Sequence, residues 1–81
     1  MKLTDYQIEK LKHCFGLDYS RKPYRNYYHC NQINDEWEDM CIKGYANKEI
    51  KGQKEIIYFG TLKGLRMVFR RNITIKYYNT I

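Results

Sequence analysis

The chain has 81 residues, which is enough for one domain with one modest hydrophobic core. Hydrophobic residues make up 43% and aromatic residues 16% of the sequence, and this composition excludes an intrinsically disordered chain. No apolar run approaches the roughly 20 residues that a membrane-spanning helix needs. The formal net charge of +6 suits a partner that is nucleic acid or an acidic protein surface.

The charge is unevenly distributed along the chain. Residues 1–33 and 44–81 are basic, whereas residues 34–43 hold four acids and one lysine. A basic C-terminal half attracts phosphate or an acidic protein, and an acidic central segment does not. No secretion signal precedes the first predicted helix, and three cysteines do not make a paired disulfide framework. We therefore expect a soluble cytoplasmic protein.

The clearest predicted element is a helix over residues 5–15. Thr4 is a suitable N-cap, and Gln7 three residues later completes a capping box. Apolar residues then recur on one helical face, at Ile8, Leu11 and Phe15. Gly16 supplies the left-handed residue that ends such a helix.

The next segment, residues 17–33, shows no helical period and contains Pro23. We expect an ordered loop in which residues 24–30 form a short extended piece. A second helix is predicted over residues 35–43, with Asn34 as its N-cap and Gly44 as its stop.

A β-hairpin is predicted next, with strands over residues 46–50 and 55–59 and a tip over 51–54. Thr61 can cap a third helix that begins at Leu62, and alternation over residues 73–78 predicts a final strand. The predicted fold class is α+β, a single domain over residues 1–81 with helices around a two- to three-stranded antiparallel sheet. The predicted core is Ile8, Leu11, Phe15, Leu17, Trp37, Met40, Ile57, Leu62, Leu65 and Phe69.

Two stretches resemble known families. A helix, a hairpin and a further helix, with the junction at residues 58–65, resemble the end of a winged-helix domain. Residues 8–13, 16–18 and 21–27 resemble a family of small phage and prophage proteins that usually lack an assigned function. The first resemblance implies a small winged-helix-like domain, and the second implies a phage origin. The predicted helix before the wing is acidic, which departs from winged helices that read DNA with that helix.

Metal binding and catalysis find little support in the sequence. The pairs His13-Cys14 and His29-Cys30, together with Cys41, lack the paired spacing of structural zinc sites. Cys14 and Cys41 are better explained as small core residues. Adjacent helical residues such as His13 and Cys14 point in different directions and do not form a nucleophile–base pair. We expect no enzyme activity, no metal and no cofactor.

Basic residues near aromatic ones are the strongest functional signal, although a solvated surface is an alternative explanation. The first predicted binding group surrounds the hairpin and third helix, at Lys48, Lys51, Lys54, Lys63, Arg66, Arg70 and Arg71. The second lies in the loop, at Arg21, Lys22, Tyr24 and Arg25. An acidic partner face is predicted at Asp35, Glu36, Glu38 and Asp39. Nine tyrosines in the chain reflect either an AT-rich gene or a tyrosine-rich binding surface.

Two functions follow, and an assembly factor is a third alternative. The first is a phage inhibitor of the anti-CRISPR type, which binds a host defence protein or nucleoprotein complex in the bacterial cytoplasm. The second is a winged-helix-like transcriptional regulator that binds DNA directly. The acidic segment favours the first function, and the basic hairpin favours the second.

Overall fold

Three antiparallel strands form an open sheet in which the last strand of the chain lies in the middle. The computed structural model describes residues 3–69 and 73–81. The strands are β1 (Tyr28–Cys30), β2 (Ala46–Gly52) and β3 (Glu55–Gly60), in the order β1-β3-β2. Tyr28 pairs with Tyr58 across one side of β3, and Asn47 pairs with Phe59 across the other.

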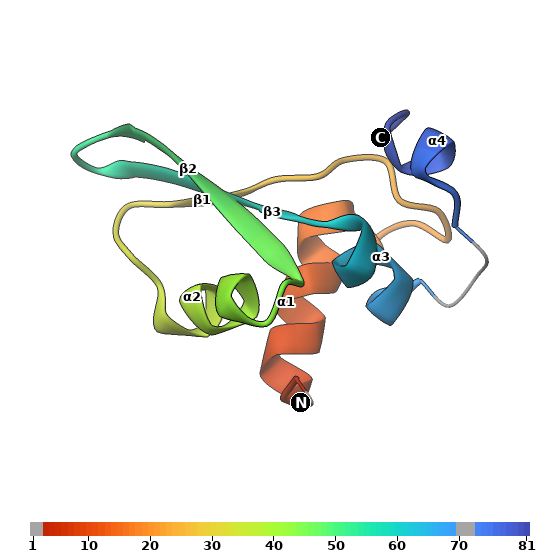
Figure 1. Cartoon of the computed structure of the whole chain (residues 1–81), viewed down its shortest axis with the longest axis horizontal. Coiled ribbons are helices and arrows are strands. Elements are labelled where there is room, and N and C mark those ends of the chain that lie inside the picture. Colours follow the sequence, from red (N-terminus) through yellow and green to blue (C-terminus); the bar gives the residue numbers. More distant parts are fainter. Residues whose placement is uncertain (1–2, 70–72) are drawn as a thin grey trace.

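Four helices complete the described part of the chain. They are α1 (Asp5–Phe15), α2 (Asp35–Ile42), α3 (Leu62–Val68) and α4 (Ile75–Tyr78). In Figure 1, α1, α2 and α3 lie below the sheet, and α4 stands at the end of the molecule away from the hairpin tip. This arrangement confirms the predicted α+β class and is consistent with a small winged-helix-like domain.

The predicted capping of α1 is confirmed in detail. The Thr4 hydroxyl accepts a hydrogen bond from the Gln7 amide at 3.1 Å, and the Gln7 side chain accepts one from the Thr4 amide at 2.9 Å. Gly16 ends the helix with a φ of 78°, a conformation that favours glycine. The helix is therefore fixed at both ends by residues that its own sequence supplies.

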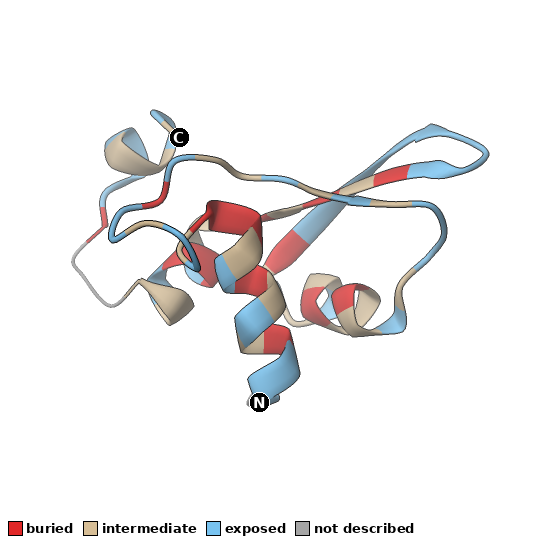
Figure 2. Ribbon diagram, turned by 180° about the vertical axis from the view of Figure 1, so that it is seen from behind, coloured by how far each residue is buried: buried red, intermediate tan, exposed pale blue. Residues whose placement is uncertain are grey.

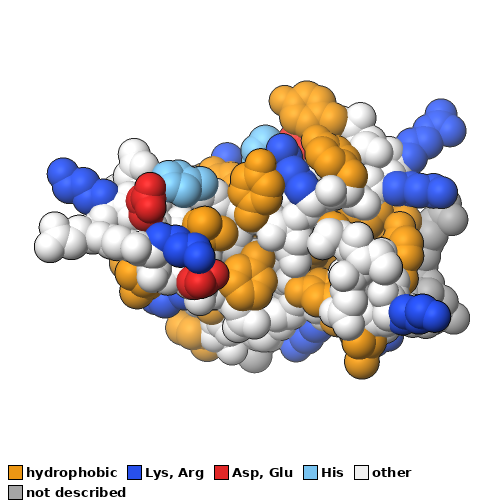
Figure 3. Space-filling model, turned by 90° about the horizontal axis from the view of Figure 1, so that it is seen from above, with side chains coloured by type: hydrophobic (Ala, Val, Ile, Leu, Met, Phe, Trp, Pro, Cys, Tyr) orange, Lys and Arg blue, Asp and Glu red, His pale blue; other side chains and the backbone are white. Residues whose placement is uncertain are grey.

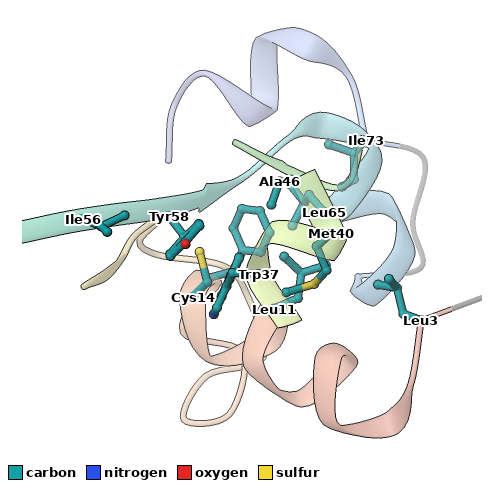
Figure 4. Packing of buried hydrophobic residues seen from close by; sticks show 11 residues of the cluster. Leu3, Leu11, Cys14, Trp37, Met40, Ala46, Ile56, Tyr58, Leu65 and Ile73 are labelled. Carbon is teal, nitrogen blue, oxygen red and sulfur yellow. The ribbon is translucent and has the colours of Figure 1, made fainter. Parts of the chain in front are cut away.

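The buried side chains come from every layer of the fold (Figure 4). Five predicted core residues are buried: Leu11, Phe15, Trp37, Met40 and Leu65. Four others are half-buried against them: Ile8, Leu17, Leu62 and Phe69. The prediction for Ile57 is wrong, because β3 turns Ile56 and Tyr58 toward the helices and leaves Ile57 half-exposed between them. Adjacent strand residues point to opposite faces, so only one set can be buried.

Helix α2 is held by two hydrogen bonds from Gln7 of α1 and by ring contacts of Trp37 with the sheet. Gln7 is buried, and its side-chain nitrogen donates to the Glu36 carbonyl at 3.1 Å and to the Asp39 carboxylate at 2.8 Å. Trp37 lies between Tyr28 and Tyr58, with ring centroids 5.2 and 5.4 Å apart. These contacts fix α2 against both the first helix and the sheet.

Asn26, two residues before β1 begins, extends the pairing along β3. The register that pairs Tyr28 with Tyr58 puts residue 26 opposite Gly60. The Asn26 side chain accepts from the Gly60 amide at 2.7 Å and donates to the Gly60 carbonyl at 3.0 Å. Tyr78 of α4 donates its hydroxyl to the same carbonyl. One backbone unit therefore holds both the α1–β1 segment and the C-terminal helix.

The predicted strand over residues 73–78 is wrong. Ile73 is buried, but Ile75–Tyr78 form a short helix. The Thr74 side chain accepts a hydrogen bond from the Tyr77 amide at 3.1 Å, which caps this helix. A threonine that bonds to a nearby amide competes with extended structure, and this local bond decides the outcome here.

Gly64 explains how α3 approaches the chain before β2. A Cβ atom at this position would collide with the Tyr45 carbonyl oxygen, which is backbone and cannot rotate away. Glycine is therefore required by close packing, even though it lowers helix propensity.

We expect Gly64→Ala to destabilise the protein by about 1–3 kcal/mol, the usual cost of overpacking a tight contact. Gly52→Ala is the matched control, because nothing lies within 4 Å of a Cβ atom at that position. Urea unfolding of both variants measures the difference. Equal stability of the two variants would contradict the close contact at Gly64.

Candidate interaction surfaces

The β2–β3 hairpin forms an arm that extends beyond the helices (Figure 1). Residues 47–55 are all exposed, and Figure 2 shows the outer part of the arm in the colour of exposed residues. Near the tip, the Lys51 ammonium lies 3.0 Å from the Glu49 carboxylate. Lys54 is exposed at the turn and has no ion pair among the described residues. The arm thus presents polar groups to solvent and adds little to the core.

Two of the four predicted acids are used inside the fold. Glu38 accepts from Lys48 at 2.8 Å and from the Tyr58 hydroxyl at 2.7 Å. Asp39 lies 2.8 Å from Lys43 and also accepts from Gln7. Hydrogen bonds from these partners lower the pKa of both carboxyl groups. Both acids therefore help to dock α2.

The other two predicted acids lie in the first turn of α2. Asp35 is exposed and Glu36 is half-buried, and neither carboxylate has an ion pair within the described ranges. The free part of the predicted acidic face therefore consists of these two residues.

The structure separates the basic residues of the hairpin from those of the third helix. Lys63 donates to the Lys43 carbonyl at 3.0 Å and lies 4.6 Å from the Tyr45 ring centroid. Arg66 donates to the Ile73 carbonyl at 3.0 Å. Figure 1 places α3 far from the hairpin tip, so these groups do not form one patch with it. The predicted residues Arg70 and Arg71 lie outside the described residues.

The second basic group stays together in the α1–β1 segment. Arg25 donates to the His13 carbonyl at 2.8 and 3.2 Å. Its guanidinium carbon lies 5.5 Å from the Tyr24 ring centroid and 5.7 Å from that of Tyr27. Arg21 and Lys22 are exposed beside them. The cation–aromatic cluster predicted here is therefore present, with Arg25 held by backbone.

A surface hollow of about 510 Å³ lies beside α1 and was not predicted. It is lined by Tyr6, Glu9, Lys10, Lys12, His13, Leu17, Asp18 and Tyr28. A sequence signal for it exists, because Tyr6, Lys10 and His13 recur at helical spacing on one side of α1. Figure 3 shows a face of the molecule on which hydrophobic side chains mix with lysine, arginine, histidine and a few acidic side chains.

Burial makes the thiols of all three cysteines less acidic than a free thiol, because it raises the pKa of each. Cys14 is buried, its thiol donates to the Asn26 side chain at 3.3 Å, and burial raises its pKa to about 12. Burial also raises the pKa of Cys41. Within residues 3–69 and 73–81, no three His, Cys, Asp or Glu side chains gather as a metal site. The same residues contain no helix that is both long and apolar enough to cross a membrane.

Comparisons with known protein families, with curated proteins and with solved structures find no match to this chain. The proposed function therefore depends on the residues, on their geometry and on the resemblance of residues 8–13, 16–18 and 21–27 to small phage proteins.

The Glu38 contacts predict a loss of stability in acid. The pKa of Glu38 is lowered from its ordinary value of 4.5, mainly by the hydrogen bond from Lys48 and then by that from Tyr58. The stability that the ionised Glu38 carboxylate contributes is fully present above its ordinary pKa of 4.5. This stability is lost as the pH falls through the lowered pKa of the folded state. We expect the stability advantage of the wild type over Glu38→Gln to shrink as the pH falls.

Urea unfolding of both proteins at neutral pH and in acid measures this change in the free energy of unfolding. Asp35→Asn is the matched control, because it also replaces a carboxylate by the amide of the same size and Asp35 has no ion pair among the described residues. A wild-type advantage over Glu38→Gln that is the same at both pH values would contradict the lowered pKa.

Proposed function

We propose that this protein is a non-catalytic, phage-encoded inhibitor that binds a bacterial defence nucleoprotein complex, with a CRISPR effector as the leading target. The observation that carries the proposal is the exposed hairpin arm, residues 47–55. Folding orders these residues at an entropic cost, yet they bury little surface within the chain. An exposed and mostly polar arm of this kind suits insertion into a charged surface of a partner.

The charged side chains that have no ion pair among the described residues support the same proposal. Lys54 stands at the tip of the arm, while Asp35 and Glu36 stand at the start of α2. A surface with both signs of charge gives fast association and selectivity when the partner is complementary. Nucleoprotein complexes offer both signs, because phosphate lies beside basic protein surfaces.

A binding role without catalysis agrees with the state of the nucleophilic groups. The thiol of Cys14 is held protonated by its raised pKa, and the thiolate is the reactive form. The hydroxyl of Ser20, the single serine, accepts from the Lys22 amide at 3.3 Å. The resemblance of residues 8–13, 16–18 and 21–27 to small phage proteins supports a phage origin and action in the cytoplasm of the bacterial host.

A DNA-binding regulator is the second candidate, and one observation favours it. Glu38 and Asp39 are paired with Lys48 and Lys43, so α2 repels phosphate less strongly than its sequence predicts. The hairpin would then act as a wing on the DNA backbone. Binding to free duplex DNA with a defined site separates this candidate from the inhibitor.

The inhibitor proposal is tested by phage plating on bacteria whose CRISPR system targets that phage. We expect expression of the protein to raise plating efficiency by orders of magnitude, and Lys54→Glu to reduce this rescue. Lys76→Glu is the matched control, since it makes the same charge change at an exposed residue of α4.

Two outcomes would contradict the proposal. The first is absence of rescue against effectors of several types, with the protein folded and expressed. The second is tight, site-specific binding of the purified protein to duplex DNA at physiological salt without a protein partner, which supports the regulator.

A further inference from the structure

The exposed tyrosines are confined to one part of the chain. Tyr6, Tyr19, Tyr24 and Tyr27 are between 52% and 78% exposed, and the other five tyrosines are buried or half-buried. All four lie within residues 6–27. Codon bias would scatter such residues over the surface, so this grouping favours the alternative of a tyrosine-rich binding surface.

Lysine and histidine side chains lie between these rings in a continuous series of contacts. The Lys10 ammonium lies 5.3 Å from the Tyr6 ring centroid and 5.7 Å from that of Tyr28. The His13 ring contacts Tyr28 edge-on at 5.8 Å and Tyr19 at 6.5 Å. The series thus runs from the start of α1 to the loop that follows it.

Arg25 joins the remaining two rings to this series. Its guanidinium lies near both Tyr24 and Tyr27 and donates to the carbonyl of His13. Because Asn26 is bonded to Gly60, the backbone between these tyrosines is held in place. The rings are therefore presented on a fixed support.

The hollow beside α1 lies within this series and is basic on balance. Residues 6–27 hold five basic side chains and two acidic ones, Glu9 and Asp18. The Asp18 carboxylate lies 2.6 Å from the His13 ring, and this hydrogen bond satisfies one of its oxygens. Glu9 is the remaining acid at the hollow. Lys10 and Lys12 line the same hollow and outnumber it.

We infer that this surface, residues 6–27 with Tyr28, binds a single-stranded polynucleotide. Exposed aromatic rings offer stacking faces for unpaired bases, and interleaved lysine and arginine attract the phosphates between those bases. A duplex hides its base faces in the stack and cannot use the rings. This inference goes beyond the proposed inhibitory function and does not depend on it, because the hairpin arm lies elsewhere.

Fluorescence anisotropy with labelled oligo(U) and oligo(dT), roughly 10 nucleotides long to cover a site of ordinary size, tests the inference. We expect both single strands to bind more tightly than a duplex of the same length, and affinity to fall as salt rises. Tighter binding of oligo(U) than of oligo(dT) identifies single-stranded RNA as the natural ligand, and the reverse identifies single-stranded DNA. Tyr19→Ala should weaken binding by roughly ten-fold, as loss of one stacking platform does.

Three controls separate stacking from other effects. Tyr19→Phe keeps the ring and should retain binding, whereas Ile75→Ala truncates an exposed apolar residue of α4 and should change nothing. Lys12→Glu should weaken binding and flatten the salt dependence, and circular dichroism checks that each variant is folded.

The inference is overturned if neither oligonucleotide binds at low salt, or if the duplex binds as well as the single strands. It is also overturned if Tyr19→Ala, while folded, binds as tightly as the wild type, because the interaction would then be charge attraction alone. Preferential binding of an acidic peptide over both oligonucleotides likewise overturns it.

Discussion

The pairing of the Asn26 side chain with the backbone of Gly60 is the constraint on which the arrangement of this molecule depends. An amide side chain can bond to both the N–H and the C=O of one residue, as a neighbouring strand would. Here it takes the place of a paired strand residue beside Gly60, before β1 begins at Tyr28. The absence of a Cβ on Gly60 matters too, because the Phe15 ring occupies that space. Helix α1, the loop, the sheet and α4 all meet at this point.

This constraint gives the two exposed regions different physical characters. The α1–β1 segment lacks regular structure over most of its length, yet Asn26 and Arg25 tie it to buried backbone. Its aromatic side chains can therefore bind without first paying for the ordering of the chain. The hairpin arm is held only by its own strand pairing beyond the helices, so its tip is the less restrained region. One region suits stacking, and the other suits reaching into a partner.

Local signals predicted most of the fold, and what they missed was decided in part by long-range contacts and in part by one local hydrogen bond. Thr4 and Gly16 define α1 because caps depend on neighbouring residues. The uninterrupted apolar run at residues 56–59 carries no alternation, so it could not specify which face of β3 is buried. Thr74 shows the opposite case, where one side-chain bond overrides an alternating pattern. For the candidate site, residue spacing found the basic residues but could not show that Lys48 is paired with an acid of α2.

Native-state hydrogen exchange of the Gly60 amide tests the central constraint most directly. The amide donates to the Asn26 side chain, so we expect it to exchange among the slowest in the protein and close to the limit of global unfolding. The amides of the hairpin tip at residues 52–54 should exchange much faster. If the Gly60 amide exchanges as fast as the hairpin tip, Asn26 does not hold the segment to the sheet, and the fixed support for the aromatic surface is absent.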